Sequence, residues 1–132
     1  MAIKGKMITP VVTMVTNSTP PTDEKPSLLA AYEAETLFHE FGHALHQLLS
    51  NSTYPGVSGT SVPRDFVELP SQIMEHWAFE PEVLKMYAKH YQTGETIPAD
   101  LVEKLDKASK FNTGFTTVEF LAAALLDMEF HS

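Results

Sequence analysis

The sequence contains no cysteine among its 132 residues. This absence excludes disulfide bonds, and it also excludes thiolates as metal ligands or as nucleophiles. Any metal site in this chain must therefore use histidine, aspartate or glutamate side chains.

Positive charge is also scarce. Nine lysine and arginine residues stand against 17 acidic residues, which gives a formal net charge of −8. Nucleic acid is not expected as a partner, because phosphate binding requires clustered lysine and arginine side chains. The acidic residues form no long block, and we interpret them as a solvated surface.

Long apolar runs are missing as well. None approaches the ~18 residues that a membrane-spanning helix requires, so no membrane partner is expected. The first residues, MAIKGKMITP, lack the apolar core and cleavage site of a signal peptide, which favours a cytoplasmic protein. The apolar fraction of 43% is typical of a globular core, and the length suggests one domain or a piece of one.

The residue pattern predicts a mainly α fold with a minor β element at the N-terminus. Valine, isoleucine and threonine predict an edge strand over 7–16, where a proline removes one backbone donor. Asp65 with Glu68, and Thr116 with Glu119, resemble capping boxes at helix starts. Helices are expected over 28–50, 66–79, 81–93, 98–110 and 116–130.

The stretch ETLFHEFGHALHQLL at 35–49 places histidines and glutamates inside an otherwise apolar helix. His39 and His43 are one helical turn apart, so their imidazoles can converge on one ion. Glu40 lies about 100° around the helix from His39, within reach of a water on that ion. This H-E-x-x-H pattern is typical of a zinc site with two histidine ligands and a glutamate base.

A third ligand is required, and the residues leave two candidates open. A metzincin would have glycine and histidine where this chain has His46 and Leu49, so that class is excluded. Glu68 follows a loop that is long enough to fold back to the metal helix, and Glu75 would share its helical face. Alternatively, Glu68 is only the far half of a capping box, with its carboxylate turned toward the Asp65 amide.

Other polar residues of the apolar helix are expected to support the site. Glu35 lies one turn before His39 and can accept a hydrogen bond from a ring nitrogen that does not bind metal. We interpret His46 as a hydrogen-bonded residue that lies in the core or next to the metal ligands, and not as a ligand itself. The competing interpretation is a helical interaction domain in which HEFGH is structural, although burial of these groups without compensation would be unfavourable.

Three blocks in a fixed order resemble a known family. They are LFHEFGHALH at 37–46, SGTSVPRDFVELPSQIMEHWAFEP at 58–81 and KFNTGFTTVEFLAAALLD at 110–127. Together they resemble the thimet oligopeptidase family of zinc metallopeptidases, family M3. The stretch from PRDFVELPSQ to GETIP is most similar to the bacterial peptidyl-dipeptidase branch, and GKMITPVVTMVTNSTPP also resembles the segment before the metal helix. The resemblance covers essentially the whole chain.

By this resemblance, His39, His43 and Glu68 bind one zinc ion per chain, and Glu40 is the catalytic base. The fold implied is an HExxH zincin core of the gluzincin type, mainly helical with small β elements. The activity implied is hydrolysis of peptide bonds in short peptides. The residues expected to support the ligands are Glu35, Glu75 and His46.

Members of the family are several times longer than this chain. Residues 1–132 are therefore expected to be a partial catalytic domain, the zinc-binding core of a larger metallopeptidase. In the family, a later segment rich in glycine and tyrosine stabilises the oxyanion, and no residue here takes over that role. We expect weak or absent peptidase activity of the chain alone, and self-association through apolar surfaces that a larger enzyme would cover. The alternative is a fragment that binds zinc without catalysis.

Overall fold

The computed structural model describes residues 2–3, 6–7 and 9–132, and nearly all of their regular structure is helical. The predicted mainly α fold class is therefore confirmed. Two compact units are distinguished, residues 1–87 and 88–132. In chain order, the elements are β1 (Ala2–Ile3), β2 (Lys6–Met7), α1 (Ala31–Leu49), the 3-10 turns η1 (Pro55–Val57) and η2 (Gly59–Ser61), α2 (Arg64–Val67), α3 (Leu69–Ala78), α4 (Pro81–Tyr87), α5 (Ala99–Ser109) and α6 (Thr113–His131).

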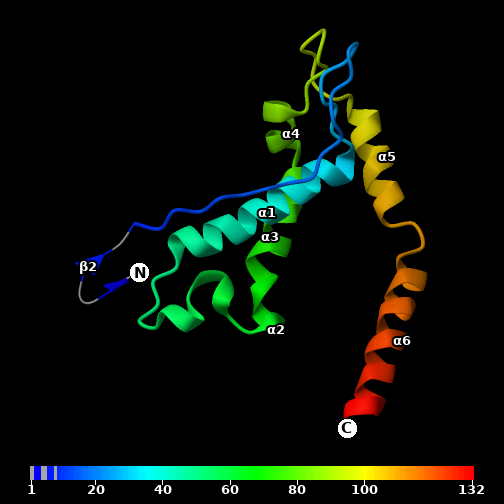
Figure 1. Ribbon diagram of the computed structural model, residues 1–132. Helices are drawn as coiled ribbons and strands as arrows, with labels where there is room; N and C mark the ends of the chain where they lie inside the picture. Colours follow the sequence, from blue (N-terminus) through cyan, green and yellow to red (C-terminus); the bar gives the residue numbers. More distant parts are fainter. Residues whose placement is uncertain (1, 4–5, 8) are drawn as a thin grey trace. The chain divides into compact units, whose positions relative to one another are not determined.

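The β component is smaller than the sequence predicts. β1 and β2 pair antiparallel over two residues each. The strand expected over 7–16 is wrong for residues 9–16, which have no regular structure, and Ile8 lies outside the described residues. Residues with high β propensity form a strand only where a partner completes the hydrogen-bond ladder. This segment instead runs along α1, as the blue trace in Figure 1 shows.

Glu33 fixes the start of α1. Its carboxylate accepts the backbone N–H groups of Ala30 and Thr19, each at 2.6 Å, and the Thr19 hydroxyl at 2.7 Å. The bond to the Ala30 N–H satisfies a backbone donor that a helix start otherwise leaves free. These bonds, from the Ala30 backbone first and then from Thr19, hold the pKa of the Glu33 carboxyl below its usual value. They also tie the preceding loop to the helix.

α1 and α3 cross at very short range (Figure 1). Gly42 makes this approach possible, because a Cβ at its position would lie 2.5 Å from the Ser71 Cα and 2.6 Å from the Pro70 carbonyl oxygen. Both obstacles are backbone atoms, which cannot swing away as a flexible side chain would. The buried apolar residues among those described are few and mostly small, namely Ala34, Ala44, Ala78 and Leu84.

The loop after α1 is fastened back onto the end of that helix. The Ser50 hydroxyl oxygen accepts the Gly59 N–H at 2.9 Å, and the Gln47 side-chain oxygen accepts the Thr60 N–H at 3.2 Å. Gly59 has a φ of +56°, which a residue with a side chain rarely adopts. The loop therefore turns sharply beside α1 before the chain enters α2.

The helix predicted over 66–79 is interrupted at Glu68, between α2 and α3. Pro70 explains the interruption, because it has no N–H to continue the hydrogen bonds of α2 and is tolerated only in the first turn of a new helix. The predicted capping box of Asp65 and Glu68 is also wrong. Pro63 is the cap residue of α2, and the Glu68 carboxylate bonds to Ser71.

The helices after α3 differ in length from those that the sequence predicts. The helix expected over 81–93 ends at Tyr87, and a turn closed by an isolated bridge between Lys89 and Thr96 follows. α5 agrees with the predicted 98–110, but α6 begins before Thr116. The Thr116 hydroxyl therefore donates to the Asn112 carbonyl within the helix and caps nothing. Among the helices that the structure describes, none has the length and apolar character needed to cross a bilayer.

Candidate metal centre

Three side chains meet where α1 crosses the junction of α2 and α3. His39 and His43 come from one face of α1, and Glu68 comes from the break between α2 and α3. One ligand atom from each lies within 4.8 Å of the others. The Nε2 atoms of His39 and His43 lie 3.3 Å and 3.2 Å from the same Oε2 atom of Glu68. The structure thus brings together the three residues that the resemblance implied as ligands.

The second ring nitrogen of His39 is also occupied. Its Nδ1 lies 2.5 Å from Oε1 of Glu75 on α3. When Nδ1 donates its proton to this carboxylate, Nε2 of the neutral ring carries a lone pair. That lone pair faces the Oε2 atom of Glu68, which is also a hydrogen-bond acceptor. A cation between these two acceptors would stabilise the arrangement. The donor set of two imidazoles and one carboxylate also suits a divalent metal such as zinc.

Glu68 is held in the ionised form that metal binding requires. The hydrogen bond from the Ser71 hydroxyl, at 2.7 Å, is the main cause that lowers the pKa of the Glu68 carboxyl. The nearby His43 and His39 lower it further, and partial burial opposes them. The side chain is 48% exposed, so its position depends on these contacts more than on packing.

Glu35 lies near His39. The sequence suggested Glu35 as the acceptor for the ring nitrogen of His39 that does not bind metal, but in the structure Glu75 is that acceptor. Glu35 lines a small cavity of about 290 Å³ together with Thr36, His39, Glu40 and Glu75. Burial, and then the charge of Glu75, raises the pKa of the Glu35 carboxyl, while His76 lowers it. Glu35 therefore belongs to the surroundings of the cluster.

His46 lies one turn beyond His43 and outside the His–His–Glu group. Its ring meets Phe66 edge-on, with centroids 6.0 Å apart. Its Nδ1 is buried without a hydrogen-bond partner among the described residues, as is Nδ1 of His43. His46 also lines an apolar cavity of about 370 Å³ with Gly42, Leu45, Leu49, Ser50, Pro70, Ile73 and Met74.

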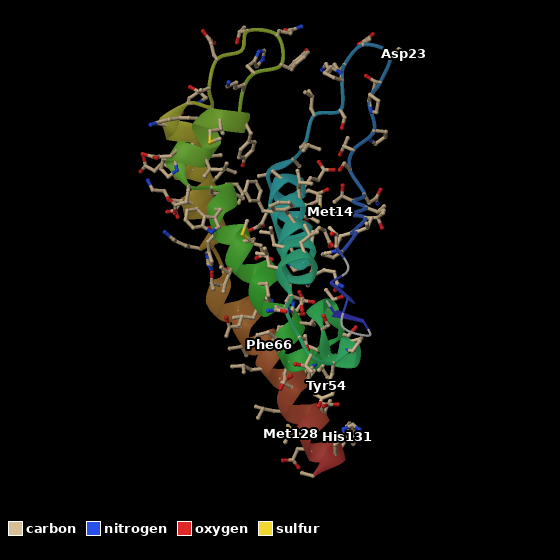
Figure 2. All side chains as sticks on the ribbon, turned by 90° about the vertical axis from the view of Figure 1, so that its left-hand side faces the viewer. Met14, Asp23, Tyr54, Phe66, Met128 and His131 are labelled. Atoms are coloured by element: carbon tan, nitrogen blue, oxygen red, sulfur yellow. The ribbon has the colours of Figure 1, made fainter. Side chains whose placement is uncertain are left out.

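Glu40 faces a larger cavity beside the cluster. This opening of about 470 Å³ is lined by Glu40, His43 and Gln47 of α1, by the segment 11–15, and by residues of η2. Figure 2 shows Met14 of that segment beside α1, whereas Asp23 lies at the far end of the loop that leads back to the helix. A carboxylate that does not belong to the ligand group thus borders a space large enough for part of a small ligand.

Sequence reasoning missed two residues that shape this centre. Gly42 allows α1 and α3 to touch, and Ser71 bonds to the Glu68 carboxylate. Both stand next to predicted ligands, since Gly42 precedes His43 and Ser71 follows Glu68 by one helical turn. The HEFGH motif contained the signal for Gly42, because a glycine inside a helix indicates close packing.

Two histidines and a glutamate that meet beside an open cavity form the donor set of a divalent metal site in a helical protein. The comparisons with known proteins agree: the model of peptidase family M3 matches residues 2–132. Dipeptidyl carboxypeptidase of Salmonella typhimurium is 53% identical over 122 residues, which cover 92% of this chain and 18% of that protein. The chain belongs to peptidase family M3.

Two further relatives are also similar to nearly the whole of this chain over a small part of their own length. Dipeptidyl carboxypeptidase of Escherichia coli K12 is 51% identical over 92% of this chain and 18% of its own length. Oligopeptidase A of the same organism is 42% identical over 97% of this chain and 19% of its own length. The chain thus spans less than a fifth of the length of these relatives.

Proposed function

We propose that this chain carries the centre of a zinc-dependent peptidase that hydrolyses short peptides, of the peptidyl-dipeptidase type. The observation that supports the proposal most is the approach of both histidine Nε2 atoms to one Glu68 oxygen. The 53% identity to a dipeptidyl carboxypeptidase supports the substrate class. Residues 1–132 would form part of a catalytic domain with an HExxH zincin core, and its cytoplasmic location stays a prediction.

In this proposal the ligands of one zinc ion are His39, His43 and Glu68. Zinc in such a site supplies a Lewis acid that polarises a peptide carbonyl and makes a water more acidic. Glu40 accepts the proton of the attacking water and passes it to the leaving amine. Glu75 keeps the His39 ring oriented through Nδ1, which leaves Nε2 free to bind metal.

The cavity beside Glu40 is the proposed place for the peptide substrate. The segment 11–15 contributes an extended stretch of backbone to its wall and belongs to no strand pair in the described part of the chain. Backbone N–H and C=O groups of this kind bind an extended peptide by adding it as a strand. A peptide in this cavity would lie within reach of the Glu40 carboxylate.

The proposal is tested with the zinc-loaded chain and an internally quenched short peptide. We expect slow hydrolysis that depends on zinc, because the resemblance assigns oxyanion stabilisation to a family segment outside residues 1–132, and loss of one oxyanion donor costs ~10²–10³ in rate. Glu40→Gln should abolish the residual rate without lowering the zinc content. Glu82→Gln, an exposed carboxylate on α4, serves as the matched control.

Each alternative has its own outcome in this experiment. A rate that survives Glu40→Gln, or that persists after zinc removal, would contradict the proposed base. Zinc binding without any hydrolysis would favour a metal-binding fragment that lacks catalysis. A chain that binds no zinc would favour the helical interaction domain, in which HEFGH is structural.

A further inference from the structure

Ser71 is completely buried, although serine side chains are mostly exposed in proteins. It lies in the first turn of α3, three residues after Glu68. A buried hydroxyl group requires a hydrogen-bond partner, and the choice of partner shows what the residue stabilises.

The Ser71 hydroxyl donates toward two oxygens of Glu68. One is the backbone carbonyl oxygen at 2.9 Å, and the other is the carboxylate Oε2 at 2.7 Å. The first contact is ordinary for a serine in a first helical turn, and that carbonyl also accepts the Gln72 N–H at 2.9 Å. The second contact is different, because it requires the Glu68 side chain to fold back over the turn.

The carboxylate oxygen that Ser71 contacts is the one that faces both histidines. Oε2 of Glu68 lies 3.3 Å from Nε2 of His39 and 3.2 Å from Nε2 of His43. A carboxylate oxygen has two lone pairs, so the bond from Ser71 leaves one lone pair for a metal ion. The bond therefore directs this oxygen without removing it from the ligand set.

Ser71 also touches the helix that carries the histidines. The Gly42 position comes so close to the Ser71 backbone that an added Cβ would lie 2.5 Å from the Ser71 Cα. Gly42 stands between His39 and His43 in the sequence of α1. One residue thus contacts α1 through its backbone and the Glu68 carboxylate through its hydroxyl group.

We propose that Ser71 is a positioning residue that fixes the Glu68 carboxylate at the distance from α1 at which all three ligands meet. The proposal rests on the proposed zinc site. A glutamate side chain that is half exposed has several rotamers, and ordering it on metal binding is entropically unfavourable. The Ser71 hydroxyl orders the carboxylate beforehand and thereby raises the affinity of the site for zinc.

The first experiment measures the zinc Kd of the full chain by competition with a chromophoric chelator. Ser71→Ala should raise the Kd by ~10–100-fold, the usual effect of removing a group that orients a ligand. Ser58→Ala is the matched control, because Ser58 is only 3% exposed and its hydroxyl pairs with Ser50 at 2.9 Å, away from the ligands. Ser58→Ala should leave the Kd unchanged.

The second experiment separates positioning from a general loss of packing. In a Glu68→Ala background, Ser71→Ala should cause no further change in the residual affinity of the two histidines for zinc. The pair Ser71→Thr and Ser71→Val supplies a second comparison, since these side chains have similar bulk and only threonine keeps the hydroxyl group. The threonine variant should bind zinc ~10-fold or more tightly than the valine variant.

The outcomes separate this inference from the site on which it rests. If the unsubstituted chain binds zinc and Ser71→Ala behaves like Ser58→Ala, the positioning role is overturned and the metal site stands. An equal loss of affinity in the Glu68→Ala background, or equal Kd values for threonine and valine, would also overturn it. If the unsubstituted chain binds no zinc, the metal site fails and the role of Ser71 fails with it.

Discussion

At the scale of single residues, His39 is the most constrained side chain of the candidate centre. Its Nδ1 contacts Glu75, which lies within α3, and its Nε2 faces Glu68, which lies at the start of α3. These two carboxylates together fix the orientation of the ring. His43 has one such contact, and its Nδ1 has no partner among the described residues. The orientation of the His39 ring therefore depends on Glu75, which belongs to no part of the His–His–Glu group.

Removal of Glu75 should weaken zinc binding while the ligands remain. In Glu75→Ala the Nδ1 proton of His39 has no carboxylate acceptor, so the ring loses both its fixed tautomer and its orientation. We expect a ~10–100-fold higher zinc Kd, measured by chelator competition. Glu82→Ala is the control on the exposed surface, and an unchanged Kd in Glu75→Ala would show that the contact does not support the site.

Two glutamates near the start of α1 should respond to pH in opposite directions in the metal-free chain. The pKa of Glu33 is lowered from 4.5, so its contribution to stability is present above pH 4.5 and is lost as the pH falls through the lowered value. The pKa of Glu35 is raised from 4.5, so ionised Glu35 destabilises the fold as the pH rises through that higher value.

The matched variants Glu33→Gln and Glu35→Gln test this difference by thermal unfolding. At pH 7 the first should lower the Tm and the second should raise it, because each removes one of the two opposed contributions. The difference between Glu33→Gln and the unsubstituted chain should shrink as the pH falls below 4.5. Shifts of the same sign at pH 7 would contradict this assignment.

The sequence predicted the residues of the His–His–Glu group because helical spacing places His39 and His43 on one face. The family resemblance was required to choose Glu68 over Glu75, since spacing alone left both open. The acceptor for His39 lay beyond such reasoning, because Glu35 and Glu75 are on different helices and only their packing decides which one reaches Nδ1.

At the scale of elements, the crossing of α1 and α3 determines the geometry of the site. The two histidines belong to one helix, and the acidic residues Glu68 and Glu75 belong to the start and body of the other. Any change in the separation of these helices changes the distances between all of them. Gly42, which lies at the point of closest approach, should therefore be sensitive to the smallest substitution.

Gly42→Ala should destabilise the chain and weaken zinc binding together. Its methyl group would meet the backbone of Ser71 at 2.5 Å and that of Pro70 at 2.6 Å, so the helices must separate. Overpacking of this kind costs about 1–3 kcal/mol, which urea unfolding measures. Gly56→Ala is the control, because a Cβ there has no atom within 4 Å. Unchanged stability and Kd in Gly42→Ala would contradict the close crossing.

The prediction of elements succeeded where local signals were strong and failed where one residue changed the outcome. The apolar pattern around HEFGH predicted α1 to within three residues at its start and one at its end. Pro70 divided the next helix at Glu68, and this break is what turns the carboxylate toward α1. The strand expected over 7–16 was wrong for residues 9–16, because a strand needs a partner, which propensity does not supply.

At the scale of the whole molecule, the chain exposes much of its apolar surface. α6 shows this most clearly, since its large apolar residues are all at least half exposed, among them Phe120 at 74% and Leu125 at 66%. Figure 2 shows side chains such as Met128 projecting from this helix. Contiguous apolar surface of this extent is rare on isolated soluble proteins and marks sites of association.

We therefore expect the isolated chain to self-associate. Sedimentation velocity should show a mass that rises with concentration above that of the 14.7 kDa monomer. The double variant Leu121→Ser and Leu125→Ser, which changes one face of α6, should reduce the association. Glu119→Ser on the same helix is the control. A monomer at all concentrations would contradict this expectation.

At this scale, the sequence predicted the family of the chain correctly. Three blocks in fixed order identified family M3, and the match over residues 2–132 agrees. The division into two compact units was not predicted, because it depends on contacts between distant residues and no composition change marks residue 88. The sequence analysis predicted exposed apolar surface, but it did not predict that this surface includes α6.

The central claim is that His39, His43 and Glu68 form one zinc site, and elemental analysis tests it most directly. Zinc is measured in the chain purified without added metal, beside Glu68→Ala and the control Glu82→Ala. We predict about one zinc per chain in the unsubstituted protein and the control, as expected for a site with three protein ligands, and little in Glu68→Ala. Equal zinc in all three, or no zinc even after zinc is supplied, would contradict the claim.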